Sequence, residues 1–470
     1  MNKNNYTKGY ILLGLVALIG LTSCGTAYHY KTPDYNTENL YGEMTTTVDT
    51  ITIANIPWKA YFTDVNLVTL ITEGIENNYD LQIAYTRIQQ AEASLSMAKA
   101  AYFPDVSLVG QVNHSRNSNG QNGKDVLGYH STDYSLGISA SWELDIWGKL
   151  GKQSKAKYAQ FLNSYAYKNL IHSSLVANIA TSYYSLLALD EKLSITIETV
   201  RLLEESVETI EALKIAGLQN GAAVEQSKAL LYSTQASIPD LESQIRQMEN
   251  SICTMIGRKP GAITRSTISD QRYTNQFEYG IPAQMLAKRP DVQQAELSFR
   301  SAFELTHAAQ ASFYPSITLS SGTLGYGTSN TLSNFFKPEN IFASIIGGLT
   351  QPLFAKKQLT GNLKIAKAQQ HEALLTFEQT VLSAGQEVND ILFSFESSMK
   401  KNETRKRQIK ACHNSVYFTQ ELLKAGDANY TEVLTAEQNL LSALLNQVND
   451  KLEQLQCSVD LYKALGGGVE

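Results

Sequence analysis

The sequence predicts a mainly helical fold with a smaller β part that lies in a membrane. Three observations support this prediction. The chain contains two copies of one pattern, each copy has a helical segment of more than 60 residues without proline, and each copy has two strand-like segments. With 470 residues, 43% hydrophobic and 18% charged, the chain has the length of two or three ordinary domains or of one elongated repeat. Its composition is not that of a disordered protein.

Composition and motifs exclude several classes of function. The net charge of -6 at pH 7 argues against a nucleic-acid binder, because such proteins use basic residues to neutralise phosphates. Four cysteines without a C-x-x-C pattern are too few for a disulfide scaffold. His371 and Glu372 begin a zinc-protease motif, but Leu375 breaks it, and no phosphate-binding loop or nucleophile motif occurs. We therefore expect no enzyme, no metal site and no cofactor other than lipid.

The first residues are typical of an export signal. Lys3 and Lys8 precede an apolar stretch over 10–21, which is too short to span a bilayer as a helix. The sequence Leu-Thr-Ser-Cys that ends at Cys24 resembles a bacterial lipobox. It predicts a signal peptide over 1–23 and a diacylglycerol and N-acyl chain, such as palmitate, on Cys24. The alternative is an ordinary signal peptide with an incidental cysteine. Gly25 follows Cys24, and without an aspartate retention signal there we expect the outer membrane as the destination.

The chain is an internal duplication. Residues 78–104 and 289–315 share one pattern at an offset of 211, and in each copy a proline follows an aspartate by 24 positions. The similarity continues downstream, where 213–217 lie over 422–426. Self-similarity of this kind indicates repeated structural units. We predict a first repeat over 66–257, a linker over 258–281 and a second repeat over 282–468, preceded by a segment over 24–65.

Each repeat is expected to begin with a helix and a strand pair. The helices are predicted over 66–102 and 282–313, because an aromatic-proline pair follows each and proline stops a helix. The strands are predicted at 105–113 and 133–144, and at 316–326 and 341–351.

The segment from Tyr134 to Trp142 alternates apolar with small or polar residues, as a strand does when its two faces meet different surroundings. Its length suits a tilted strand of a membrane β-barrel, although a soluble β-sandwich would show the same alternation. Four strands cannot close a barrel, and lipid tolerates no open sheet edge. Three chains would supply 12 strands.

A very long helix completes each repeat together with a return helix. Segments 152–216 and 359–425 lack proline, and at 1.5 Å per residue each would measure roughly 100 Å, which is typical of a coiled coil. Glycine turns place the hairpin tips near 217–223 and 426–432. Ser237 and Pro239 are interpreted as a restart of the first return helix, because serine caps helices and proline suits a first turn.

Four ordered stretches resemble the TolC-like outer-membrane efflux factors, in particular the lipoprotein branch that serves resistance-nodulation-division pumps. They are 141–148 (SWELDIWG), 288–296 (KRPDVQQAE), 351–354 (QPLF) and 426–434 (GDANYTEVL). The similarity runs from about Asn66 to Gly468.

This resemblance implies a homotrimer. Its shared 12-stranded β-barrel, with four strands per chain, would continue into a long periplasmic α-helical barrel. The N-terminal segment over 24–65 and the linker would lie on an equatorial belt. A periplasmic adaptor would contact the hairpin tips at Gly217, Gly221, Gly426 and Asn429, and would connect them to an inner-membrane pump.

The implied function is a passive duct for drugs or other small molecules, opened by the adaptor and pump. Two alternatives remain at this point. One is a type I secretion duct for unfolded polypeptide, and the other is a lipid-tethered periplasmic scaffold whose strands form a soluble sheet.

The resemblance also implies a periplasmic aperture at Asp427, Tyr430, Glu432 and Thr435. The family often has aspartate where this chain has Thr435. Glu432 lies three residues earlier, on a neighbouring helix face, and is expected to supply the acidic ring instead. The alternative is that Glu432 is a solvated tip residue.

Two charged clusters lie near the tips, and we expect them to pair between neighbouring helices, with adaptor docking as the alternative. Cys253, Cys412 and Cys457 are expected to be free thiols. The acidic cluster contains Glu204, Glu205, Glu208 and Glu211, and the basic cluster contains Lys400, Lys401, Arg405, Lys406, Arg407 and Lys410.

Overall fold

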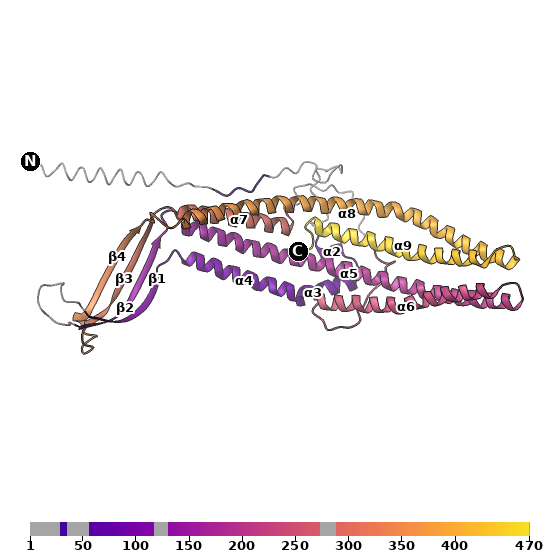
Figure 1. The fold of residues 1–470 in the computed structure, drawn as a ribbon, viewed down its shortest axis with the longest axis horizontal. Coiled ribbons are helices and arrows are strands. Elements are labelled where there is room, and N and C mark those ends of the chain that lie inside the picture. The colour runs from indigo at the N-terminus through magenta and orange to yellow at the C-terminus, as the bar shows by residue number, and fades with distance from the viewer. Residues whose placement is uncertain (1–28, 35–55, 117–129, 273–287, 470) are drawn as a thin grey trace, which may run out of the picture. The chain divides into compact units, whose positions relative to one another are not determined.

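A computed structural model describes residues 29–34, 56–116, 130–272 and 288–469. Cys24, the predicted lipidation site, lies outside these residues. The helices and strands are named in Figure 1. In chain order they are α2 (Trp58–Tyr61), α3 (Val65–Asn77), α4 (Tyr79–Ala100), β1 (Asp105–Arg116), β2 (His130–Leu144), α5 (Lys149–Ile215), α6 (Gly221–Met255), α7 (Pro290–Ala311), β3 (Ser316–Ser329), η4 (Pro338–Asn340), β4 (Ile341–Thr350), α8 (Gln358–Ala425) and α9 (Tyr430–Ala464).

The chain divides into two compact units. The first holds the described residues 29–34, 89–116, 130–162 and 296–375, and the second holds 56–88, 163–272, 288–295 and 376–469. Among the described elements, both halves of the chain share one order, in which α4 or α7 is followed by two strands, a helix of 67 or 68 residues and a helix of 35 residues.

The first unit contains one four-stranded antiparallel sheet in the order β1-β2-β3-β4. The sequence predicted these strands to within three residues at each boundary, and β1 and β2 extend further toward the loop that joins them. A register shift interrupts β3 opposite β4, between Ser320 and Thr323. Because β1 and β4 each have one neighbour, they form the two edges of the sheet within the described chain.

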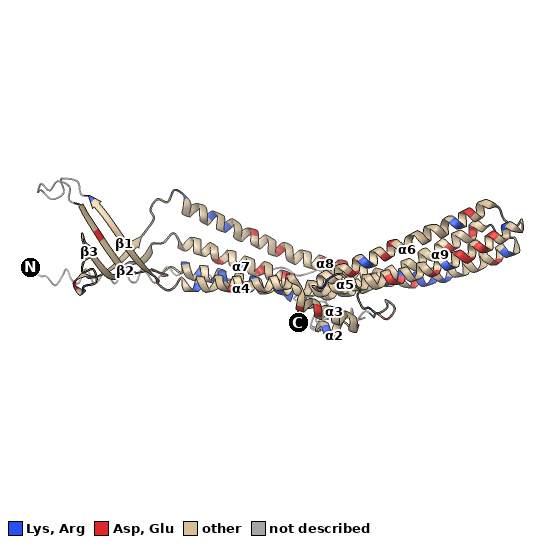
Figure 2. Cartoon of the chain, turned by 90° about the horizontal axis from the view of Figure 1, so that it is seen from below, with Lys and Arg blue, Asp and Glu red and all other residues tan. Residues whose placement is uncertain are grey.

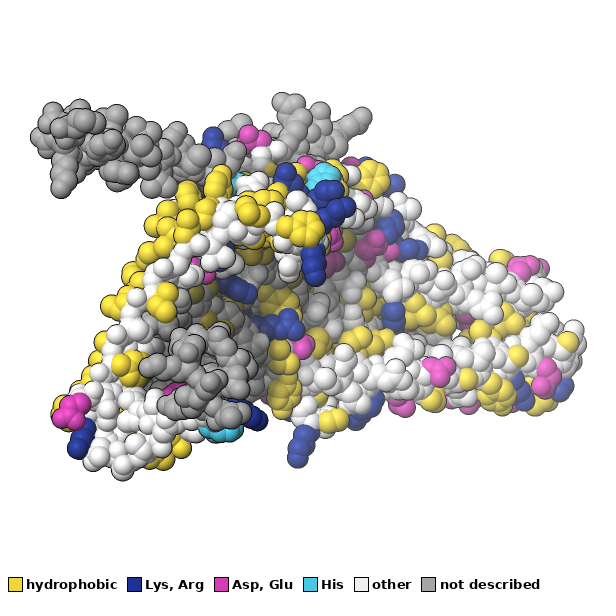
Figure 3. All heavy atoms as spheres, turned by 60° about the vertical axis from the view of Figure 1, so that its left-hand side comes forward, with side chains coloured by type: hydrophobic (Ala, Val, Ile, Leu, Met, Phe, Trp, Pro, Cys, Tyr) yellow, Lys and Arg dark blue, Asp and Glu magenta, His cyan; other side chains and the backbone are white. Residues whose placement is uncertain are grey.

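The two faces of the sheet differ in chemistry. Directly paired residues of antiparallel strands share a face, and the register places Leu108, Ile138 and Leu324 together. Figure 3 shows hydrophobic side chains gathered along one side of the strands. The apolar face carries Val106, Leu108, Val112, Tyr134, Leu136, Ile138, Ala140, Trp142, Ile317, Leu319, Leu324, Tyr326, Ile341, Ala343, Ile345 and Leu349. The opposite face carries mainly serine, threonine, asparagine and glutamine, including Ser107, Gln111, Asn113, Ser135, Ser139, Thr323 and Ser344.

The N-terminal residues of the first unit lie against α7. The side chains of Tyr30 and Thr32 both donate hydrogen bonds to Glu296, at 3.3 and 2.8 Å. The ring of Tyr30 also contacts Phe299 and Phe303 of the same helix. These contacts attach the chain to α7 a few residues after Cys24.

The second unit has the larger hydrophobic core. Trp58 and Tyr61 of α2 are buried, and the Tyr61 ring stacks on Tyr462 of α9 at 4.2 Å between centroids. Ile179 and Leu186 of α5 are fully buried in the same core, with residues of α3, α6, α8 and α9 around them. Residues 56–65 of the segment before the first repeat thus contribute to this core, whereas residues 29–34 of the same segment lie against α7 in the first unit.

Three predicted helices differ from those observed. The helix expected over 66–102 is broken at Asn78, which ends α3 and caps α4 through a hydrogen bond from Leu81 N to its Oδ1 at 2.9 Å. The restart expected at Ser237 is wrong, because α6 is continuous and contains Pro239 in its interior. The helix expected from 282 begins at Pro290 in the structure. Residues 282–287 lie outside the described part of the chain.

None of the described helices is both long and apolar enough to cross a membrane.

Candidate functional site

The two hairpin tips lie side by side in the second unit, where the α5–α6 and α8–α9 turns meet (Figure 1). Each turn has a glycine at positive φ, 76° at Gly217 and 83° at Gly426. Leu218 N and Asp427 N donate to carbonyls five residues earlier, at 2.9 and 3.0 Å. A glycine with these backbone bonds is a regular way to end a helix, because glycine adopts positive φ without steric cost.

An asparagine starts the return helix after each turn. The Oδ1 atom of Asn220 accepts a hydrogen bond from Ala223 N at 3.0 Å, and that of Asn429 accepts one from Thr431 N at 3.2 Å. Asparagine is among the best residues for this position because its side chain satisfies a free N–H of the first turn. The two copies therefore build their tips in the same way.

Apolar side chains hold the two tips together. Ile210 of α5 and Val224 of α6 pack with Leu423, Tyr430 and Val433 of the other hairpin. Tyr430 is 1% exposed, and its hydroxyl lies 3.1 Å from Ser206 Oγ. The prediction that Tyr430 faces an aperture is therefore not supported, since its ring fills the core between the hairpins.

The other residues predicted at the tips are on the surface. Asp427, Glu432 and Thr435 are exposed, as are Gly217, Gly221, Gly426 and Asn429. Thr435 Oγ1 donates to the Thr431 carbonyl at 2.8 Å and so points along its own helix. The aperture and adaptor-contact roles of these residues stay predictions.

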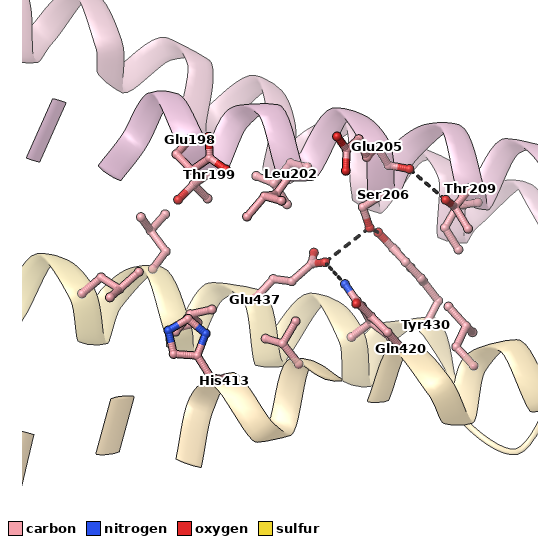
Figure 4. Close-up of a pocket in the computed structure, with 18 of the residues that line it drawn as sticks. Glu198, Thr199, Leu202, Glu205, Ser206, Thr209, His413, Gln420, Tyr430 and Glu437 are labelled. Atoms are coloured by element: carbon pink, nitrogen blue, oxygen red, sulfur yellow. Dashed lines mark hydrogen bonds between the residues drawn. The ribbon is translucent and has the colours of Figure 1, made fainter. Parts of the chain in front are cut away.

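A cavity of about 750 Å³ lies behind the tips, between α5, α8 and α9. Figure 4 shows the lining side chains of α5 on one side and those of α8 and α9 on the other. The walls are mostly apolar, and Leu202 on α5 is 46% exposed, so the cavity opens to solvent. The apolar lining residues are Ile195, Leu202, Leu203, Ile210, Leu213, Val416, Leu423, Val433, Leu440, Leu441 and Leu444.

Glu437 places a carboxylate in this apolar cavity. Its Oε1 atom accepts long hydrogen bonds from Ser206 Oγ at 3.4 Å and from Gln420 Nε2 at 3.3 Å, which join α9 to α5 and α8 (Figure 4). Its Oε2 atom is buried and has no hydrogen-bond partner. Burial raises the pKa of Glu437, because removal from water disfavours the charged form, and the two hydrogen bonds oppose this shift only in part.

The sequence analysis missed Glu437. The signal was present in the spacing, because Tyr430, Glu437 and Leu444 are seven residues apart, with Val433 and Leu440 between them. Residues at this spacing share one face of a helix. A glutamate on a face otherwise made of tyrosine, valine and leucine indicates either a partner or a specific role.

Some members of the two charged clusters pair with a neighbouring helix and others pair within their own helix, and no ion pair between the described residues joins one cluster to the other. Figure 2 shows acidic and basic residues interspersed along the hairpins. On the basic cluster, Arg405 Nε donates to Asp450 of α9 at 2.8 Å, and Lys401 pairs with Glu453. On the acidic cluster, Glu211 pairs with Lys228 of α6 at 2.7 Å. Most of these groups are partly or well exposed, and each such pair contributes little to stability.

The described cysteines are not paired in disulfide bonds. Cys253, Cys412 and Cys457 are free thiols, as predicted, and Cys253 and Cys457 are buried. Within the described ranges, no three histidine, cysteine, aspartate or glutamate residues are grouped in a way that would hold a metal ion.

Comparison with known proteins explains the duplicated hairpins and the strands. A family model described as "Outer membrane efflux protein" matches residues 70–258 and 281–467, one match for each half of the chain. The chain belongs to the outer membrane efflux protein family. It is 28% identical over 462 residues to "Cation efflux system protein CusC" of Escherichia coli O6:H1, covering 97% of this chain and 98% of that protein. It is 27% identical to "Probable outer membrane lipoprotein SilC" of Salmonella typhimurium, covering 87% and 88% of the two chains.

Solved structures show the same fold. A crystal structure of CusC matches with a TM-score of 0.80 at 28% identity, covering 93% of this chain and 99% of that one. The open state of the Neisseria gonorrhoeae outer membrane channel MtrE matches with a TM-score of 0.80 at 26% identity, covering 95% and 99%. The chain therefore has the TolC-like fold predicted from its sequence, and it is an outer-membrane efflux channel component rather than an enzyme.

Proposed function

We propose that this efflux channel works as a homotrimer whose three sheets close one 12-stranded barrel. The observation that carries the proposal is the sheet itself, which has one apolar face and two edge strands, β1 and β4, without a second neighbour in the described chain. In lipid, each backbone N–H or C=O group without a hydrogen-bond partner at a sheet edge raises the free energy by several kcal/mol. This is the order of magnitude for the transfer of an amide from water to an apolar medium.

Closure between chains would satisfy these edges. Neighbouring strands alternate in direction along the chain, so β1 and β4 are antiparallel to each other. The β4 edge of one chain can then pair with the β1 edge of the next in the same antiparallel pattern. The apolar face would meet lipid, and the serine- and threonine-rich face would line a water-filled duct.

The channel itself supplies no energy and depends on two partner proteins. The duct is passive, and its tips open when a periplasmic adaptor and an inner-membrane pump of the resistance-nodulation-division class engage them. Related proteins carry names that fit this assignment, including "Probable efflux pump outer membrane protein TtgC" of Pseudomonas putida, which is 27% identical over 481 residues. The cargo is drugs or other small molecules. A diacylglycerol and N-acyl chain on Cys24 would add a lipid anchor to the barrel.

Native mass spectrometry of the protein extracted from outer membranes in mild detergent tests this proposal. We expect three chains per particle, each with acyl mass on its N-terminal cysteine. A Cys24→Ser variant should lose the acyl mass and so separates lipidation from assembly. A lipidated monomer as the dominant species in the membrane extract would leave the sheet edges open and would overturn the shared barrel.

A further inference from the structure

We propose that the cavity between α5, α8 and α9 binds an organic ammonium ion with an apolar body, whose N–H group donates a hydrogen bond to Oε2 of Glu437. The site lies within one chain, so it goes beyond the proposed function and does not depend on the number of subunits.

The cavity has the size and walls of a small-molecule site. Its volume of about 750 Å³ is within the range of about 300–1,000 Å³ that is usual for ligand pockets. Such pockets are mostly apolar with a few converging polar groups. Here leucine, isoleucine and valine side chains from three helices form the walls, and Ser206, Gln420 and Glu437 converge at one place (Figure 4).

The charge of the ligand follows from the unused oxygen of Glu437. Oε1 already accepts two hydrogen bonds, whereas Oε2 is buried without a partner. An ionised carboxylate accepts through both oxygens, and a buried acceptor without a donor is costly. A positively charged N–H donor supplies the missing hydrogen bond and compensates the charge in the same contact, so an ammonium ion fits better than a neutral amide or an anion.

Other ionisable lining residues have partners or lie elsewhere in the cavity. Glu198 and Glu205 both bind Arg201 on their own helix, and Lys424 binds Glu421 at 2.8 Å. The imidazole of His413 lies apart from the Glu437 carboxylate along the cavity (Figure 4). Glu437 is therefore the group that would decide the charge of a bound ligand.

Because the cavity lies between the two hairpins, a bound ligand would affect how they pack. A ligand on Glu437 would touch α5 of one hairpin and α8 and α9 of the other, behind the shared tip cluster. It would fill space that both hairpins border, so it would favour the arrangement in which they are packed together.

Dansylcadaverine is a suitable probe, because it joins a primary ammonium to an apolar fluorescent ring system. The full-length protein, reconstituted in lipid nanodiscs, would be titrated with the probe while its emission is recorded. We expect saturable binding with a blue shift, weakened about tenfold or more in Glu437→Gln, because a charge-assisted hydrogen bond becomes a neutral one. N-acetyl-dansylcadaverine, which lacks the ammonium, should lose affinity by a similar factor.

Two further variants make the test specific. Glu432→Gln removes a carboxylate from the exposed tip and should leave binding unchanged. Thr199→Trp places a large ring in the cavity and should abolish binding even if Glu437→Gln fails to fold.

Three results would overturn the proposal. They are the absence of saturable binding, equal affinity of the wild type and Glu437→Gln for the ammonium probe, and binding that survives Thr199→Trp.

Discussion

Glu437 makes the packing of the hairpins depend on pH. Burial raises the pKa of Glu437 in the folded protein above its value in the unfolded chain. The contribution of this shift to the free energy of unfolding is therefore complete below the unfolded pKa and is lost as the pH rises through the folded pKa. We expect Glu437→Gln to slow backbone hydrogen exchange of residues 430–444 at pH 7.5, by about 1 kcal/mol of opening free energy. This increase in opening free energy should be smaller near pH 5, where the wild-type carboxyl is more often protonated. The same gain at both pH values would show that the carboxylate is not the cause.

Substitution of Glu432 tests the prediction that this residue forms an acidic ring at the aperture. It is exposed in the first turn of α9, three residues before Thr435. If it lines the closed aperture, Glu432→Ala removes a carboxylate and its bulk from the narrowest point. The single-channel conductance of the isolated channel in planar bilayers should then rise, and selectivity for cations should fall. Asp427→Ala is the matched comparison at the same tip, and unchanged conductance in Glu432→Ala would remove Glu432 from the gate.

At the scale of single residues, the sequence predicted what depends on local conformation and missed what depends on distant partners. The glycine turns at Gly217 and Gly426 follow from glycine's freedom to adopt positive φ, which is a local property. The resemblance to the efflux factors implied an aperture role for Tyr430, yet residues of the other hairpin bury its ring. The position of Glu437 on an apolar helix face is a local signal, but its hydrogen bond from Ser206, which is 231 positions away, follows from no local pattern.

Asn78 sets the boundary between α3 and α4. It is 7% exposed, its Oδ1 caps α4, and its Nδ2 donates to the Met255 carbonyl at the end of α6 at 2.8 Å. Asn78→Ala should lower the stability of the second unit by about 1–2 kcal/mol, as expected for the loss of a helix cap together with a buried hydrogen bond. Urea unfolding followed by circular dichroism would measure this change. The neighbouring Asn77→Ala, on an exposed side chain, should cost much less, and equal losses would contradict the capping role.

Elements were predicted well where their signals are periodic and local. The strand alternation and the absence of proline over more than 60 residues placed β1 to β4, α5 and α8 within a few residues. No local pattern predicts the break of the first helix at Asn78, because the partner of the Asn78 side chain is the end of α6. Pro239 was misread for a related reason. Ile238 next to it packs against the cluster of Val200, Leu203 and Leu231, and this packing keeps α6 continuous through a residue that would otherwise interrupt it.

At the scale of the whole molecule, the distribution of polarity over the sheet decides where the protein resides. Ile138 and Ser139 are neighbours near the middle of β2, but Ile138 lies on the apolar face with Leu108 and Leu324, and Ser139 lies on the polar face with Ser107 and Thr323. The same substitution at Ile138 and at Ser139 therefore probes the two faces of the sheet at nearly the same position along β2.

We expect Ile138→Lys to impair assembly and Ser139→Lys to be tolerated. A lysine on the lipid-facing side of a barrel costs about 2–4 kcal/mol near the bilayer midplane, whereas a lysine on the water-filled side keeps its hydration. The measurement is the fraction of protein that resists urea extraction from purified outer membranes, compared with the wild type at matched expression. Ile138→Lys should reduce this fraction severalfold. If both variants reduced it equally, the apolar face would not be the surface that meets lipid, and the assignment of the four strands to the membrane would have to be abandoned.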